Sequence, residues 1–245
     1  MHKSSLGSAD QIEFNSARTV NGKARPVLVA IFLVPLCCVG QRIISLAQTA
    51  QQHHPPESTT EYIRALEDPG RDSWQQPDLV VQDLGLHEGD EIADLGAGSG
   101  YFTVRLAREV GPAGKVYAVD VDPQMLSYIE QRAQKEKLDN IQTILADPND
   151  PKLGSESVDL IFVCDVLHHI QDRGKYYPKL FRALRFGGRL VNVDFQKREL
   201  PIGPPVEMKI DKKECIKEIK AGGFGFRREF EFLKYQYFLV FEKQE

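Results

Sequence analysis

The sequence predicts an α/β fold: a mostly parallel sheet with helices on both faces and an antiparallel hairpin at the C-terminal end. From residue 91 onward, short apolar strands alternate with amphipathic helix patterns, which is typical of parallel strand-helix-strand units. A loop with three alternating glycines joins the first strand to the next helix. The last two strand patterns, at residues 226–232 and 237–242, are separated only by a short polar turn, which favours a hairpin.

Residues 1–47 are predicted to be a signal peptide or membrane-anchor leader. Lys23 and Arg25 precede an apolar run of fourteen residues that begins at Val27 and ends at Gly40, and small residues follow near Ala47. This run is short for a membrane span, which needs about twenty residues. We therefore favour a cleaved signal over an anchor that associates the domain with a membrane. The expected location is exported or membrane-associated, and a cytoplasmic protein is the alternative.

The domain is predicted at residues 58–245, after a polar, proline-containing linker at residues 48–57. Ser58 and Glu61 have the spacing of a capping box, which predicts that a helix begins there. Further helices are expected near 77–84 and at 102–110, 123–137, 175–184 and 212–220. The first two strands are expected at 91–94 and 115–120.

The glycine loop is the most informative motif in the chain. Gly96, Gly98 and Gly100 follow directly on the strand that ends at Asp94. Glycine permits positive φ and has no Cβ, so the backbone here can pass close to a ligand at the carboxyl edge of the sheet. The spacing is G-x-G-x-G, which differs from the G-x-G-x-x-G of dinucleotide-binding folds. A tight turn without a ligand is the alternative.

The second strand ends at Asp120, twenty residues after Gly100, where a carboxylate can accept both hydrogens of a ribose diol. Together with Asp94 and the glycine spacing, this pattern resembles the class I S-adenosylmethionine-dependent methyltransferases. It is most similar to their small-molecule branch, which includes quinone-biosynthesis enzymes, over about residues 78–243. The resemblance implies a Rossmann-like sheet of seven strands, with the third at 141–146, the fourth at 158–165 and the fifth after the glycine turn at 187–188.

The resemblance also implies S-adenosyl-L-methionine as the cofactor. Its expected binding residues are Asp94, Gly96, Gly98, Gly100, Tyr101, Asp120, Asp147 and Asp165. For three of them a structural role stays open. Asp94 either reaches the cofactor's amino group or holds the loop through backbone amides. Asp147 either meets the adenine amino group or caps a turn. Tyr101 either flanks the methionine portion or only packs.

Two adjacent histidines follow the fourth strand and are the candidate catalytic residues. His168 or His169 can serve as a general base, because imidazole titrates near neutral pH. Orientation of the acceptor and simple packing are the alternatives. The four cysteines form no C-x-x-C pair, so no metal site is implied. The domain also has too few cysteines for arsenite methylation, which depends on thiols.

The function expected is methyl transfer to a small-molecule acceptor. Residues 1–47 carry a net charge of +3, so the rest of the chain carries −7, which makes nucleic acid a poor partner. Acceptor contacts are expected from residues 64–74 and from the loop at 195–211. Two alternatives stay open, which are a non-catalytic binding protein that kept the cofactor fold and an aminopropyltransferase-like enzyme.

Overall fold

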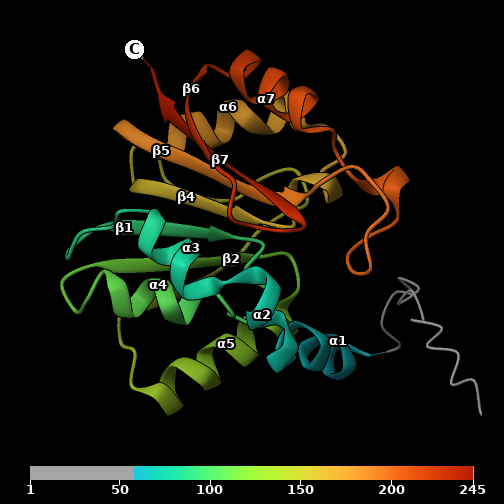
Figure 1. Cartoon of the computed structure of the whole chain (residues 1–245). Coiled ribbons are helices and arrows are strands. Elements are labelled where there is room, and N and C mark those ends of the chain that lie inside the picture. Colours follow the sequence, from blue (N-terminus) through green and yellow to red (C-terminus); the bar gives the residue numbers. More distant parts are fainter. Residues whose placement is uncertain (1–57, 245) are drawn as a thin grey trace, which may run out of the picture. The chain divides into compact units, whose positions relative to one another are not determined.

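The computed structural model describes residues 58–244 (Figure 1). The predicted leader at residues 1–47 and linker at 48–57 lie outside the described residues. The helices are α1 (Thr59–Leu66), α2 (Asp72–Gln75), α3 (Pro77–Asp83), α4 (Thr103–Glu109), α5 (Pro123–Glu136), α6 (Arg173–Ala183) and α7 (Lys212–Ala221), with 3₁₀ turns η1 (Pro69–Arg71), η2 (Leu167–His169) and η3 (Val206–Met208). The strands are β1 (Glu91–Leu95), β2 (Lys115–Asp120), β3 (Ile141–Leu145), β4 (Val158–Cys164), β5 (Leu184–Phe195), β6 (Phe224–Phe230) and β7 (Gln236–Lys243).

The seven strands form one sheet in the order β3-β2-β1-β4-β5-β7-β6. β1 to β5 are parallel, and β7 pairs antiparallel with both β5 and β6. The predicted seven-stranded, mostly parallel sheet with a C-terminal antiparallel pair is therefore confirmed. The strand order changes direction between β1 and β4. In open α/β sheets, ligands bind outside the carboxyl ends of the strands at such a switch point.

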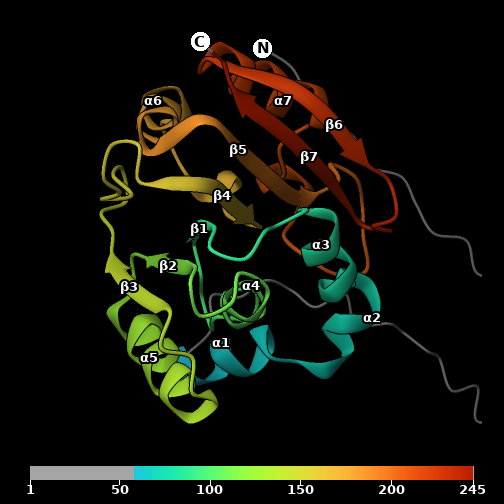
Figure 2. The ribbon, with the colours of Figure 1, turned by 90° about the vertical axis from the view of Figure 1, so that its left-hand side faces the viewer.

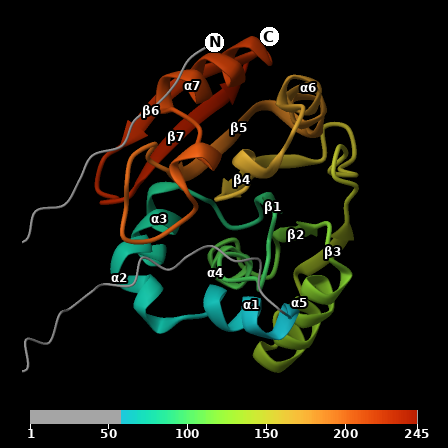
Figure 3. The ribbon, with the colours of Figure 1, turned by 90° about the vertical axis from the view of Figure 1, so that its right-hand side faces the viewer.

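Helices cover both faces of the sheet (Figures 2 and 3). One core cluster joins Ala93 and Leu95 of β1 to Tyr177 of α6 and Cys215 of α7. A second cluster joins Ile92 of the same strand to side chains of α3 and α4. β1 contributes to both clusters because it is buried on both faces: four of its five residues are buried, and the acid Asp94 is one of them. Within residues 58–244, no helix combines the length and apolar character needed to cross a bilayer.

Local sequence signals fix several element boundaries. Ser58 Oγ accepts the backbone N–H of Glu61 at 3.3 Å, as the predicted cap requires. Asp122 caps α5, whose first residue is Pro123. Most element boundaries lie within two residues of those predicted from the sequence. The largest difference is at β5, which starts at Leu184 directly after α6, whereas the fifth strand was expected only after the glycine turn at 187–188.

Candidate active site

The glycine loop connects β1 to α4 at the carboxyl edge of the sheet. Its glycines all have positive φ angles, which are 73° at Gly96, 54° at Gly98 and 78° at Gly100. A Cβ built on Gly96 would lie only 2.2 Å from Val166 Cγ2. The amides of Gly96 and Ala97 both donate to the carbonyl of Val119, at 2.8 and 3.1 Å. The loop thus crosses the end of β2, and no residue with a side chain fits at its first position.

Asp94 is buried beneath this loop, with 3% of its surface exposed. Its Oδ2 accepts a hydrogen bond from Thr103 Oγ1 at 2.6 Å. Burial raises the pKa of this carboxyl to about 7, although the Thr103 hydrogen bond opposes the rise. Since Thr103 is the first residue of α4, the pair ties the end of β1 to the start of that helix. A bound cation would favour the ionised form of Asp94.

Asp120 holds the middle of the glycine loop. Its Oδ2 accepts the N–H of Gly98 at 2.8 Å, and its Oδ1 accepts the N–H of Asp122 at 2.9 Å. A carboxylate offers about four acceptor positions, so two are still available for the hydroxyls of a ligand. The next residue, Val121, is 56% exposed. Asp120 therefore shapes the loop, and its predicted contact with a ribose stays a prediction.

Asp165 follows β4 and faces the same edge. It has a φ of 59°, and its Oδ1 accepts Gln236 Nε2 at 2.7 Å. Burial is the main cause that raises the pKa of the Asp165 carboxyl, and the charge of Asp194 raises it further. Three acidic residues therefore converge at the ends of β1, β2 and β4.

A chain of buried amides links Asp165 to Arg71. Gln236 Oε1 accepts Gln75 Nε2 at 2.6 Å, and both glutamines are almost completely buried, at 2% and 0% exposure. Arg71 Nε donates to Gln75 Oε1 at 3.3 Å. The positive charge of Arg71 opposes the rise in pKa of both Asp94 and Asp165. Arg71, from the segment before β1, thus places a positive charge close enough to Asp94 and Asp165 to favour their ionised forms.

Tyr101 is held by side chains rather than left open to a ligand. Its hydroxyl donates to Asp72 Oδ1. The guanidinium carbons of Arg71 and Arg105 lie 4.0 and 4.3 Å from the centroid of its ring. The ring is 5% exposed, so packing accounts for most of its surface. Its predicted contact with the methionine portion of the cofactor stays a prediction.

The residues around α1 pack directly on the glycine loop. Ser99 Oγ donates to Glu67 Oε1 at 2.6 Å, and Arg132 Nη1 donates to the same oxygen at 2.7 Å. A Cβ on Gly98 would lie 3.0 Å from Leu66 Cδ1. The N-terminal segment of the domain therefore shelters the loop from solvent.

His168 is the better placed of the two candidate bases. Its Nδ1 lies 2.9 Å from Asp194 Oδ1, and the two side chains are 2% and 0% exposed. Burial lowers the pKa of His168, but the hydrogen bond and charge of Asp194 outweigh it, so that the pKa is raised overall. The other oxygen of Asp194 has no hydrogen-bond partner among the residues described. His169 is exposed, and its ring centroid lies 4.2 Å from that of His168.

Asp147 lies in a turn after β3. It forms an isolated bridge with Asp150, and its Oδ2 pairs with Lys152 Nζ at 2.5 Å. The Asp147 side chain is 63% exposed. Asp147 therefore lies in a turn, as one of the two roles expected from the sequence requires. Its predicted contact with the adenine amino group stays a prediction.

The two predicted acceptor segments meet beside the acidic site. The Trp74 ring lies 5.8 Å from the Phe195 ring and 6.5 Å from the Tyr235 ring, between centroids. Phe195 directly follows Asp194 at the end of β5, so the two side chains point to opposite faces of the strand. Trp74 is only partly buried, whereas Phe195 is 5% exposed.

Comparison with known proteins decides the family. The model of a methyltransferase domain matches residues 86–236, which is more than half of the chain. This chain belongs to the class I methyltransferase family. The S-adenosylmethionine-dependent methyltransferase from Aquifex aeolicus is 28% identical, and its crystal structure superimposes with a TM-score of 0.72 over 77% of this chain and 100% of that one.

Two curated methyltransferases are similar over part of their length. The ubiquinone/menaquinone biosynthesis C-methyltransferase of Pasteurella multocida is 31% identical over 131 residues, which are 51% of this chain and 46% of that protein. The arsenite methyltransferase of Halobacterium salinarum is 30% identical over 106 residues, which are 43% of this chain and 27% of that protein. The matches thus span about half or less of these relatives.

Several residues of this methyltransferase site were not predicted from the sequence. Thr103, Gln75, Gln236 and Asp194 are brought together only by the tertiary fold. Asp194 carried one available signal, because it is an acid near the end of the fifth strand, as Asp94, Asp120 and Asp165 are of theirs. Within residues 58–244 no group of three His, Cys, Asp or Glu side chains is arranged to hold a metal ion.

Proposed function

We propose that this protein transfers the methyl group of S-adenosylmethionine to a small-molecule acceptor at the carboxyl edge of the sheet. The observation that carries the proposal is the convergence of Asp94, Asp120 and Asp165 around a loop that only glycine can form at Gly96. Burial raises the pKa of Asp94 and Asp165, so both carboxylates lack sufficient positive charge nearby. A sulfonium cofactor that also carries an ammonium group would supply it.

The residues present fit that cofactor. Asp120 has acceptor positions for a ribose diol, and the exposed Val121 beside it offers an apolar surface for a base. When bound, the cofactor supplies an electrophilic methyl group. The protein's part in such an in-line displacement is to align the acceptor and exclude water. Leu66 and Glu67, which pack on the glycine loop, support the exclusion of water.

His168 is proposed as the general base for an acceptor that must lose a proton. Asp194 fixes one ring nitrogen, Nδ1, which leaves Nε2 to receive that proton. The buried carboxylate stabilises the imidazolium that results. Trp74 packs against the buried Phe195 and is itself only partly buried, so its exposed part offers an aromatic surface for a planar acceptor.

The names of the relatives suggest two acceptors, a quinone precursor and arsenite. Of the described cysteines, Cys215 is fully buried and accepts a hydrogen bond from Asn192 Nδ2 at 3.4 Å. Burial raises the pKa of the Cys164 thiol well above its usual range. Neither thiol is suited to hold arsenic, which favours a carbon or oxygen acceptor on an organic molecule.

The fold itself does not decide between methyl transfer and other chemistry. The [4+2]-cyclase SpnF has the same fold, with 18% identity and a TM-score of 0.60. The deciding experiment incubates the protein with pooled small-molecule extracts and methyl-labelled S-adenosylmethionine. We expect label in an organic product with the wild type and none with Asp120→Ala. Equal background label in both would reject methyl transfer.

We also propose that the chain is exported or associated with a membrane, which rests on the predicted leader at residues 1–47. Fractionation of cells that produce the native protein, combined with N-terminal sequencing, tests this. A cytosolic protein with an intact N-terminus would reject it.

A further inference from the structure

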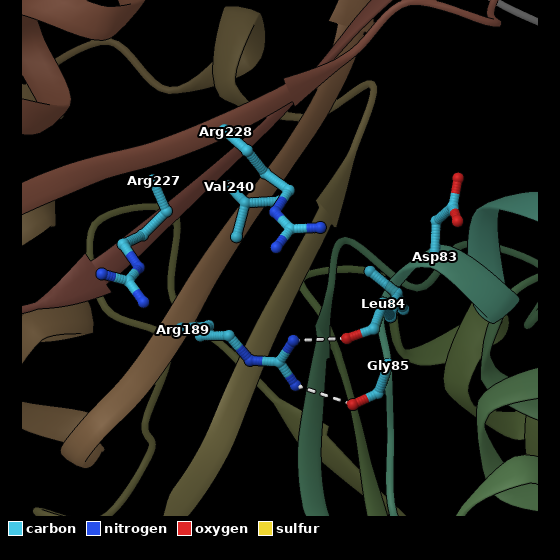
Figure 4. A pocket seen from close by; sticks show the side chains of 7 residues that line it. All are labelled: Asp83, Leu84, Gly85, Arg189, Arg227, Arg228 and Val240. Carbon is cyan, nitrogen blue, oxygen red and sulfur yellow. Dashed lines mark hydrogen bonds between the residues drawn. The ribbon is translucent and has the colours of Figure 1, made fainter.

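A separate cavity of about 300 Å³ lies near the amino ends of the strands (Figure 4). We call it the arginine cavity, and it is lined by Asp83, Leu84, Gly85, Arg189, Arg227, Arg228 and Val240. Arg189 precedes Asp194 by five residues on β5, or roughly 16 Å of extended strand. Gly85 precedes β1, whereas the acidic site follows it. The arginine cavity is therefore distinct from the candidate active site.

A β-bulge places two consecutive arginines on this face of the sheet. The pairing of β6 with β7 shifts register between Phe226 and Arg228, so that Arg227 is the extra residue. Arg228 lies opposite Val240, and Arg227 Nε pairs with Glu242 Oε2 at 2.8 Å. Val240 and Glu242 alternate on β7 and so share one face. Without the bulge, Arg227 and Arg228 would point to opposite faces.

Structural roles account for two of the three arginines. Arg189 donates to the carbonyl oxygens of Leu84 and Gly85, which directly follow α3. Arg227 has Glu242. Arg228 lies 5.5 Å from the Phe230 ring centroid, and no carboxylate between residues 58 and 244 forms an ion pair with it. Burial lowers the pKa of Arg189, and the charge of Arg228 lowers it further, so the two guanidiniums repel one another.

We propose that the arginine cavity binds a phosphate-bearing anion between Arg189 and Arg228. Arg189 lies on β5 and Arg228 on β6, with β7 between them, and Figure 4 shows both guanidinium groups beside the opening. Arg228 can present its guanidinium fork to two phosphate oxygens. Arg189 keeps only the N–H groups that it does not donate to Leu84 and Gly85, and it contributes its charge. The volume suits a small anion, since it is at the lower end of the range for ligand pockets. Asp83 at the rim limits how much negative charge the cavity accepts.

The test is calorimetric titration of the full chain with pyrophosphate at low ionic strength. We expect saturable binding that Arg228→Gln weakens about tenfold or more, because it removes charge-assisted hydrogen bonds. Arg182→Gln is the matched control, since Arg182 is an exposed arginine on α6 outside the cavity, and it should leave the affinity within about twofold. Asp83→Asn should strengthen binding, which loss of folding cannot mimic.

The source of the phosphate is distinguished by two further titrations. Glycerol 3-phosphate represents a soluble ester, and phosphatidylglycerol vesicles represent a lipid headgroup. Binding of either probe that depends on Arg228 supports the proposal and identifies the source. Absence of saturable pyrophosphate binding, or equal binding by Arg228→Gln and Arg182→Gln, would overturn it. S-adenosylmethionine affinity should be unchanged in Arg228→Gln, so this result is independent of the proposed methyl transfer.

Discussion

His168 Nδ1 lies 2.9 Å from Asp194 Oδ1 in an almost fully buried pair. Asp194 Oδ1 also accepts the backbone N–H of Phe195 at 2.8 Å, which fixes the carboxylate to β5. The pair therefore orients one imidazole toward the region where β4 and β5 end. A buried imidazole needs a hydrogen-bond partner whatever its role, so variants at His168 are needed to separate a base from a packing residue.

Replacement of His168 by alanine should lower the rate of methyl transfer by about 10²- to 10⁴-fold, which is the usual contribution of a general base. The affinity for S-adenosylmethionine should change little. His169→Ala is the matched control and should retain most of the activity, because His169 is exposed. Comparable losses in both variants would reject His168 as the base. Single-turnover rates measure the effect.

The methyl-transfer rate should rise with pH through a pKa above the ordinary histidine value of about 6.5, because the base must be neutral. Asp194→Asn should move this inflection to lower pH, since it removes the charge that raises the pKa of His168. The same pair stabilises the fold below pH 6.5 and loses that contribution as pH rises through the raised pKa of His168. An unchanged pH profile in Asp194→Asn would contradict the coupling.

Asp94→Asn should stabilise the fold and weaken cofactor binding. The pKa of Asp94 is raised to about 7, so ionising it costs the native state free energy as pH rises from about 4 to 7. This rise in pKa corresponds to a loss of at most about 4 kcal/mol in the free energy of unfolding of the wild type at pH 8. Asparagine avoids that loss and keeps an oxygen that accepts the hydrogen bond from Thr103. Urea unfolding at pH 8 and pH 4 measures this. A variant less stable than wild type at pH 8 would contradict it.

Much of the fold could be predicted from the sequence, because the local sequence patterns specify the same helices and strands that the sheet contains. Short buried strands such as β1, the cap at Ser58 and the turn before β7 each have a local cause. The glycine loop and Asp120 were predictable for the same reason, since their spacing along the chain sets their positions. The amide chain from Gln75 to Gln236 was not, because its members are 161 residues apart and meet only through the order of strands.

The arginine cavity was also unpredictable from the sequence. Arg227 and Arg228 look like alternating surface residues of a strand, and only the bulge between Phe226 and Arg228 turns them to one face. The position of Asp147 after the third strand could be predicted from the sequence, but its ion pair with Lys152 could not, and its contact with adenine stays a prediction.

Gly96→Ala should abolish cofactor binding and destabilise the fold by more than about 2 kcal/mol. The new Cβ would lie 2.2 Å from Val166 Cγ2, in addition to the cost of a positive φ. Gly187→Ala is the matched control, because its φ is 71° but no atom lies within 4 Å. Adding Val166→Ala should restore part of the loss in Gly96→Ala. Equal destabilisation in the Gly96 and Gly187 variants would show that the clash is relieved without cost.

Gln236→Leu should destabilise the protein by about 2–5 kcal/mol, because it leaves both Asp165 Oδ1 and Gln75 Nε2 buried without their partner. The double variant Gln75→Leu with Gln236→Leu should lose less than the sum of the two single losses. Urea denaturation of the four proteins closes the cycle. Strict additivity would mean that the two amides are not coupled.

The most direct measurement of the central claim is calorimetric titration of the protein with S-adenosylmethionine, compared between Asp120→Ala and Asp139→Ala. Asp139 is an exposed acid at a distance from the glycine loop in the sequence. We predict saturable binding to the wild type and to Asp139→Ala, and loss of binding in Asp120→Ala. Undiminished affinity in Asp120→Ala, or no binding to the wild type, would contradict the assignment of a cofactor site to this edge of the sheet.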